Sequence, residues 1–453
     1  MKALKALAII VALAIIPARA QAQELKTANF LDNYLYGYRL NPSVTPAGTA
    51  GFFGIGIGNI GLTAESNFGL SNFLFPLADG TLVTGLNSAV SPEQFPGGLA
   101  RMNRLNAQLS ENIFAIGLQG SAGGYYHFEI NLVSDNHFGV PRSLFEAFKN
   151  NNTTGNYLVE NINFRSSNFI EAAFGWSRRF GNLAVGGSLK GLVGVARVDA
   201  AVDLEINTAG NELWGRSKCS LMAAIPFLQI GTDADGYYDM SDVAFDKNSI
   251  KPAGLGAAVD VGASYYLFND RLIVGAALRN LGMMRWSTTI YGENTGDRVY
   301  VDLDDTDSMT EGLENMIRFK PAAGTSSGRT ALMPLSYNVS VKYKPVRLVT
   351  LGLVGTVSHY KGFAYKDLRL GAAFTPFRQF NLAASCAVGD AGTNFGVAAS
   401  VRLLGLNVYA GVDAVKHRVS PQYIPVDPVS TTVNVGVAFA IGKSRKKAAP
   451  TED

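Results

Sequence analysis

The stretch Phe169–Leu192, FIEAAFGWSRRFGNLAVGGSLKGL, carries the clearest structural pattern in the chain. Bulky apolar residues alternate with small or polar residues on both sides of Gly181-Asn182. A period of two indicates extended strands, and Gly-Asn between two such runs indicates a hairpin turn. One face is apolar and aromatic, whereas the other carries glycine, serine and single charges such as Glu171 and Lys190. An apolar exterior around a small, polar interior is typical of a transmembrane β-barrel.

The composition agrees with a barrel. Charged residues make up 17% of the 453 residues, below the roughly 25% of a typical soluble chain, and 49 residues are glycine. The same composition also suits a secreted β protein. The two cysteines, Cys219 and Cys386, fall on the apolar faces of their strands. They are interpreted as small hydrophobic residues on a lipid-facing surface, with a disulfide as the alternative.

The first 22 residues have the features of a signal peptide. Lys2 and Lys5 precede an apolar core, Ala6–Ile16, and small residues mark a cleavage site near Ala20 or Ala22. The core is too short to span a bilayer, and no later run of apolar residues is long enough to form a spanning helix. Without this segment the acidic and basic residues balance, so no nucleic acid partner is indicated.

The mature chain divides into three parts. Residues 23–50 form an irregular segment in which Pro42 and Pro46 exclude a central strand or a long helix. This segment either lies on the periplasmic side or folds into the barrel mouth as a plug, with a flexible leader as the alternative. Residues 51–442 form the barrel, and residues 443–453 are a basic periplasmic tail. Leu144, Phe145 and Phe148 lie at helical spacing after Pro141 and predict a short amphipathic helix.

Connection lengths predict the strand number and the orientation. In the C-terminal third, tight turns such as the one at Gly405 alternate with longer loops at 359–366, 389–393 and 415–430. Counting on this basis predicts about 16 antiparallel strands. The alternative is 14 strands, if the region Leu183–Ile225 holds one strand rather than three. One of those three strands is expected at 195–207. Either even number places both termini in the periplasm, with short periplasmic turns and long extracellular loops. The longest loops are expected at 226–252 and 291–333.

No arrangement of residues indicates an enzyme, a metal or a cofactor. The Gly56-x-Gly58-x-x-Gly61 spacing lies inside an alternating strand with no helix after it, so it indicates a glycine-lined strand rather than a nucleotide site. His127 and Glu129 share an inward face and form a candidate acid/base pair, although lone polar residues usually hydrate such an interior. The acidic run Asp302–Asp307 lacks the glycine turn of a calcium loop and is interpreted as solvated.

The inward faces supply the candidate functional residues. Mixed charges inside a barrel either pair in a closed lumen or line a channel, and opposite signs on neighbouring strands favour pairing in a narrow or plugged lumen. The candidate lumen-lining residues are Glu171, Lys190, Asp260, Arg279, Lys342, Arg369, Arg402 and Asp413.

Several motifs resemble a known family. These are Leu40-Asn41-Pro42-Ser43, Glu171–Ser177 with Gly186–Gly191, Gly256–Gly262, and Asn280–Trp286. Together they resemble a large outer-membrane β-barrel family of unknown function from the Bacteroidota phylum. That family is distantly similar to the long-chain fatty acid transporter barrels and to the shuttle barrel of type IX secretion.

These observations leave three hypotheses. The first is an outer-membrane transporter or channel for hydrophobic or amphipathic small molecules, in contact with outer-membrane lipid. The second is a barrel that transports nothing and acts as a scaffold for protein secretion or surface attachment, with a secretion-system protein as partner. The third is a secreted soluble β protein, which requires the apolar faces to pack against each other.

Overall fold

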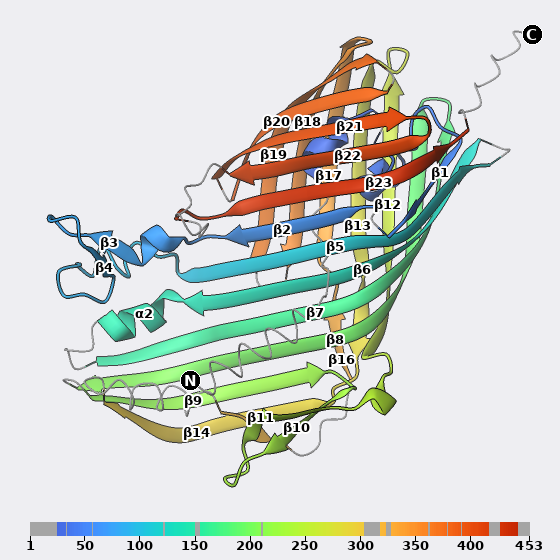
Figure 1. Ribbon diagram of the computed structural model, residues 1–453. Coiled ribbons are helices and arrows are strands. Elements are labelled where there is room, and N and C mark those ends of the chain that lie inside the picture. Colours follow the sequence, from blue (N-terminus) through green and yellow to red (C-terminus); the bar gives the residue numbers. More distant parts are fainter. Residues whose placement is uncertain are drawn as a thin grey trace, which may run out of the picture.

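Fourteen antiparallel strands close into a barrel (Figure 1). The computed structural model describes residues 25–442 except 33, 57, 121–122, 150–154, 210–211, 303–317, 323–327, 361–362, 378, 391 and 416–425. The expected fold class is therefore confirmed, with the lower of the two strand numbers. The count of 16 is wrong because Leu183–Ala209 is one continuous strand and 195–207 is its upper part. The predicted signal peptide and basic tail lie outside the described residues.

The first barrel strand is interrupted and consists of β1 (Gly51–Ile55) and β2 (Ile60–Ser66). The others are β5 (Met102–Gln119), β6 (Gly124–Pro141), β7 (Gly155–Phe180), β8 (Leu183–Ala209), β12 (Gly254–Leu267), β13 (Leu272–Trp286), β17 (Leu335–Val346), β18 (Val349–Tyr360), β19 (Phe363–Phe377), β20 (Phe380–Gly389), β21 (Gly392–Leu403), β22 (Leu406–Val415) and β23 (Ser430–Ile441). The barrel closes where β23 and β5 pair with the two sides of β1 and β2.

The alternation in the sequence correctly predicts which side chains point out of the barrel and which point into the lumen. On β7 and β8, Phe174 and Leu189 point outward and are 54% and 63% exposed, whereas Glu171 and Lys190 point inward and are buried. Exposed apolar side chains continue around the outside of the barrel and form a belt suited to lipid. These outward side chains do not pack against a second sheet, as the soluble alternative would require. No described helix is long and apolar enough to cross a membrane.

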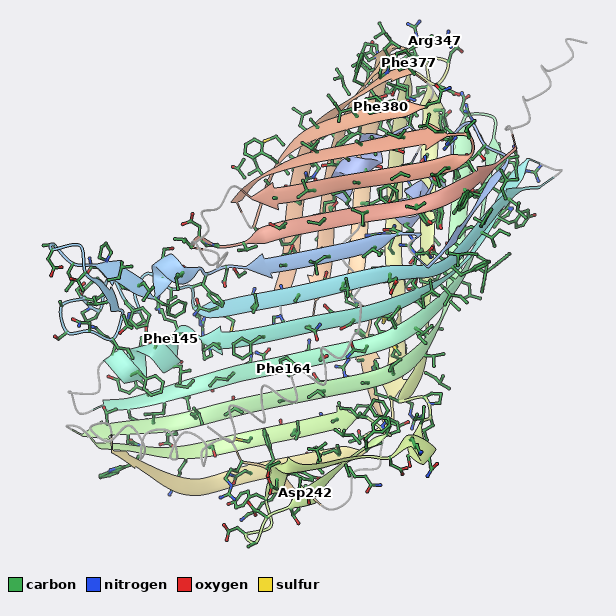
Figure 2. All side chains as sticks on the ribbon, viewed as in Figure 1. Phe145, Phe164, Asp242, Arg347, Phe377 and Phe380 are labelled. Atoms are coloured by element: carbon green, nitrogen blue, oxygen red, sulfur yellow. The ribbon has the colours of Figure 1, made fainter. Side chains whose placement is uncertain are left out.

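The connections are short at one end of the barrel, which we call the short-turn end. Gly181-Asn182 and Leu404-Gly405 are two-residue turns at this end, and the pair Gly51–Ile441 closes the barrel there. Arg347, Phe377 and Phe380 lie at the same end (Figure 2). Longer connections lie at the opposite, long-loop end. The longer loops expected at 359–366 and 389–393 are an error, since only two residues separate the strands at each place.

The barrel wall has very different heights around its circumference. β7 and β8 have 26 and 27 residues, whereas β20 and β22 have 10 each. β8 pairs with β12 up to Gly194 and with β9 (Glu212–Ala224) from Arg197 onward, and β9 pairs in turn with β14 (Ile290–Asp302). The two regions predicted as long loops therefore contain ordered strands. Besides β14, these two regions contain the strands β10 (Leu228–Thr232), β11 (Tyr238–Phe245), β15 (Lys320–Pro321) and β16 (Arg329–Leu332).

Above the belt, the outer face of the tall wall is covered by protein. The predicted helix is present as α2 (Arg142–Lys149) (Figure 1), and its Ala147 belongs to a buried apolar cluster that also contains Val159, Val202 and Cys219 of the wall. On β8 the outward side chains change from exposed at Val195 to buried beyond it. This change marks the upper edge of the belt. Cys219 lies above it and is buried by protein, so the expectation that it faces lipid is wrong.

The segment 25–50, which we call the plug, occupies the lumen toward the short-turn end (Figure 1). It contains two short 3-10 helices, Lys26–Phe30 and Gly37–Arg39. A Cβ atom added to Gly371 would lie 2.1 Å from the Phe30 ring, and one added to Gly54 would lie 2.6 Å from the Tyr36 hydroxyl. The inward glycines therefore make room for plug aromatics.

Candidate functional site

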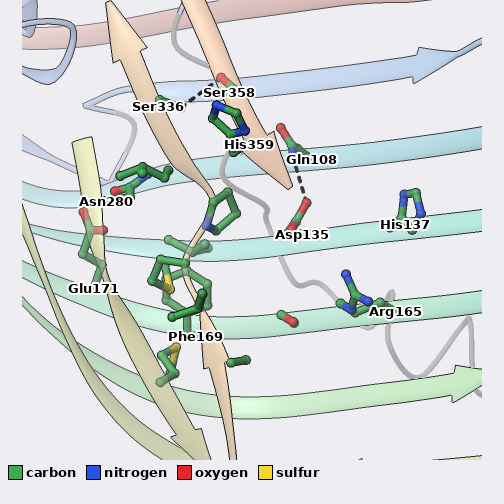
Figure 3. A pocket seen from close by; sticks show the side chains of 18 of the residues that line it. Gln108, Asp135, His137, Arg165, Phe169, Glu171, Asn280, Ser336, Ser358 and His359 are labelled. Atoms are coloured by element: carbon green, nitrogen blue, oxygen red, sulfur yellow. Dashed lines mark hydrogen bonds between the residues drawn. The ribbon is translucent and has the colours of Figure 1, made fainter. Parts of the chain in front are cut away.

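A cavity of about 1030 Å³ lies in the lumen on the long-loop side of the plug (Figure 3). Tyr38 and Arg39 of the plug line it, together with inward residues of β5 to β8, β12, β13 and β16 to β18. Three layers can be distinguished along the strands. We call them the floor, the apolar band and the collar, in order from the plug toward the long-loop end.

The floor is a buried network of ion pairs that includes four of the predicted residues. Lys190 Nζ lies 2.9 Å from Asp260 Oδ2 and 3.4 Å from Glu171 Oε2, and it donates to Asn280 Oδ1 at 2.8 Å. Glu171, Lys190 and Asp260 lie on the inward faces of β7, β8 and β12 at diagonal cross-strand positions, which brings their charges together. Arg279 completes the predicted set by donating to the backbone oxygen of Arg39 at 2.5 Å.

The plug contributes the remaining part of the floor. Arg39 Nε donates to Glu129 Oε2 at 2.9 Å, and the Tyr38 hydroxyl donates to the same oxygen at 2.8 Å. Asn131 links the two halves by donating to Glu129 and to Glu171, each at 3.1 Å. The floor thus holds three cations and three anions, so removal of any one leaves an uncompensated buried charge.

Two further predicted residues hold the beginning of the plug. Arg369, which is 1% exposed, donates to Asp413 Oδ1 at 2.9 Å. Asp413 accepts the backbone N–H groups of Lys26 and Thr27 at 2.9 and 3.3 Å. The Thr27 hydroxyl also contacts Ser385 Oγ at 2.6 Å. This cluster fixes the plug to β19, β20 and β22.

The last two predicted residues lie apart from both clusters. Arg402 donates to the backbone oxygen of Ala47 at 3.1 Å, where the plug leaves the lumen. Lys342 is half-buried on the inward face of β17. Its neighbour Lys344 binds Asp32 of the plug at 2.7 Å. Of the eight predicted residues, four therefore meet in the floor, two meet around the start of the plug, and two stand separately.

His127 and Glu129 are both engaged by the plug. The His127 ring stacks on Tyr38 with centroids 3.9 Å apart, and its Nε2 lies 3.2 Å from Ser188 Oγ. Glu129 is held by Tyr38 and Arg39. The two side chains thus have separate partners, which argues against an acid/base pair. No cluster of metal-binding side chains occurs among the described residues, and the acidic run 303–307 lies outside them.

The collar was not predicted from the sequence. Register aligns two inward rows across β5 to β8, which are Asn106, His137, Arg165 and Asp199, and next to them Gln108, Asp135, Ser167 and Arg197. Arg165 Nε and Arg197 Nη2 bind the single Asp199 carboxylate at 2.8 and 2.5 Å. Arg197 also donates to Ser167 at 2.9 Å, and Gln108 to Asp135 at 2.8 Å. The sequence did contain a signal for it: if the alternation of β7 is followed from Phe169 toward the N-terminus, Arg165 and Ser167 fall on the inward face.

The apolar band separates the collar from the floor. It consists of Val133, Phe169, Met284, Trp286 and Met333. Val133, Phe169, Gly194, Gly254 and Trp286 are successive register partners, and the Trp286 ring lies over Gly194. The Trp286 indole N–H is buried without a hydrogen-bond partner. Figure 3 shows Phe169 on β7 between Glu171 of the floor and Arg165 of the collar.

Fold and site together define a plugged, membrane-spanning β-barrel with an internal cavity of layered polarity. The chain belongs to the protein family described as "Family of unknown function (DUF5723)", whose model matches residues 42–413. The predicted membership of a barrel family of unknown function agrees with this match, while the phylum stays a prediction. No curated protein matches the chain.

Several solved outer-membrane structures are similar in fold. The toluene transporter TodX of P. putida has a TM-score of 0.45 and 9% identity, over 94% of this chain and 96% of that chain. The toluene transporter TbuX of Ralstonia pickettii has a TM-score of 0.43 and 8% identity, over 94% and 100%. The translocator domain of the autotransporter NalP from Neisseria meningitidis has a TM-score of 0.27 and 10% identity, over 85% and 89%.

Proposed function

We propose that the protein is an outer-membrane transporter that passes a small hydrophobic or amphipathic molecule through the barrel lumen, without enzymatic activity. The observation that carries this proposal is the cavity of about 1030 Å³, with an apolar band between two polar layers. A lumen that served only to stabilise the barrel would be filled by side chains, whereas ligand pockets of this size combine apolar walls with a few placed polar groups.

Orientation follows from the connection lengths. Short turns lie in the periplasm and long loops outside the cell in outer-membrane barrels, so we assign the cavity to the extracellular side and the plug to the periplasmic side. In this orientation a ligand collects above the plug, and passage into the periplasm requires the plug to move. The plug is attached to the barrel by separate polar contacts, such as Asp32–Lys344 and Arg39–Glu129.

The test locks the plug with a disulfide. Thr27 Oγ1 and Ser385 Oγ are 2.6 Å apart, close to the roughly 2.05 Å of an S–S bond, so Thr27→Cys/Ser385→Cys is placed to cross-link plug and wall. The background carries Cys386→Ala, since Cys386 is exposed beside this site. We expect uptake of the apolar probe N-phenyl-1-naphthylamine into proteoliposomes to stop on oxidation and to return on reduction.

Two controls accompany this measurement. The single variant Thr27→Cys cannot form the cross-link and is expected to be insensitive to oxidant. Deletion of residues 24–46 is expected to raise conductance in planar bilayers, with heat-modifiable migration on a gel showing that the barrel still folds. Equal uptake by the oxidised and reduced double variant would refute transport past a moving plug.

The scaffold function is the second candidate, and one observation favours it. The long-loop end is ordered well above the belt, where Phe73, Phe95 and Phe145 pack together, with ring centroids 5.4 to 6.0 Å apart. Such a structure offers a surface for a secretion-system protein. A folded barrel that shows no uptake in either redox state would support this candidate.

A further inference from the structure

The cavity has an excess of positive charge. Among the described residues that line it, eight are Lys or Arg and five are Asp or Glu. The floor is balanced, and so is the collar, where Asp135 and Asp199 offset Arg165 and Arg197. The three remaining cations of the lining are Lys26, Arg104 and Arg329. In the collar, Arg165 and Arg197 share Asp199 as their common carboxylate partner. Two guanidinium groups on one carboxylate leave donor capacity for a second anion.

The apolar band is short along the strands and wide around the lumen. The row of Val133, Phe169 and Trp286 and the neighbouring row of Met284 are two residues apart in register, or roughly 7 Å along a strand. The plug and floor close the space below. An extended acyl chain exceeds this height and would meet the charged floor, whereas a ring system fits beside Trp286. The unpartnered Trp286 N–H offers a donor at the same level.

We propose that the transported ligand is a compact aromatic acid, with its carboxylate or sulfonate at Arg165 and Arg197 and its rings against the apolar band. This inference rests on the proposed function and specifies its substrate class. The anion contributes charge-assisted hydrogen bonds in a partly desolvated site, and the rings contribute buried apolar area and aromatic contacts. The acidic group thus lies toward the long-loop end and the rings toward the plug.

The experiment compares 1-naphthoate with 1-naphthylmethanol, which has the same rings and no charge. Binding is followed by quenching of tryptophan fluorescence and by calorimetry on the full-length protein. We expect the acid to bind at least tenfold more tightly than the alcohol at pH 7. Arg165→Gln is expected to lower the affinity for 1-naphthoate about tenfold and to change the affinity for 1-naphthylmethanol by less than about twofold.

The variant is chosen so that the fold survives, because Asp199 keeps Arg197 as its partner when Arg165 is replaced. Arg142→Gln is the matched control, since Arg142 pairs with Glu146 on the exposed side of α2, outside the cavity. It is expected to change neither affinity.

The outcomes separate this inference from the proposed function. Three results would show that the ligand is not an aromatic acid, although the lumen still binds a ligand. They are equal affinity for 1-naphthoate and 1-naphthylmethanol, equal weakening of both affinities by Arg165→Gln, and tighter binding of a long-chain saturated acid. Failure of both naphthyl compounds to bind would also overturn the aromatic acid, whereas the proposed function is overturned by uptake that does not depend on the redox state of the Thr27→Cys/Ser385→Cys variant.

Discussion

Replacement of Phe174 by arginine tests where the bilayer lies on the barrel. Phe174 is 54% exposed and stands near the middle of the apolar stretch Ile170–Phe180 on β7. This stretch has the length that a tilted strand needs to cross the hydrocarbon core. Arginine at the midplane of a barrel costs about 2–4 kcal/mol. Loss of the ring contact with Tyr126, whose centroid is 6.5 Å away, adds roughly 0.5–1 kcal/mol.

The expected loss in the free energy of unfolding is therefore about 2.5–5 kcal/mol, which corresponds to a change of at least about fiftyfold in the folding equilibrium. It is measured by urea titration of the barrel in lipid vesicles. Leu158→Arg is the control on the same strand, because Leu158 is 60% exposed but pairs with Glu205 and so lies on the face turned away from lipid. We expect it to change the stability by less than about 0.5 kcal/mol. Equal destabilisation by the two arginines would refute the assigned belt.

Two further predictions concern the plug and the tall wall. Gly54→Ala places a methyl group 2.6 Å from the Tyr36 hydroxyl, so we expect about 1–3 kcal/mol of destabilisation and faster proteolysis of the plug. Addition of Tyr36→Phe should recover most of this loss, and a double variant no better than Gly54→Ala would contradict the proposed contact. Burial raises the pKa of the Cys219 thiol to about 11, so at pH 8 about one part in a thousand is thiolate. Maleimide should label only Cys386 in the folded protein in detergent and both cysteines in urea, and rapid labelling of Cys219 before unfolding would show that the wall is not covered.

Much of the barrel was predictable from the sequence because lipid imposes a simple rule. Most outward positions in the belt are apolar and every second residue points inward, so the faces of Phe174, Glu171 and Lys190 followed from alternation. The helix at α2 was predictable for a similar reason, since its apolar spacing begins directly after Pro141. Local pattern and turn chemistry carry this information, and neither depends on the partner of a strand.

Tertiary structure decided the features that depend on pairing between distant strands. β8 exchanges β12 for β9 near Arg197, and no local signal marks that exchange, so the sequence left 14 and 16 strands both open. The collar depends on the same register, which brings Arg165, Arg197 and Asp199 together from two strands. The plug was one of two alternatives until its aromatic residues were found against inward glycines. By itself, the sequence determined that this chain forms amphipathic strands with one apolar face, because that pattern is periodic along the chain. The layers of the lumen required the structure, because they are ordered across the strands.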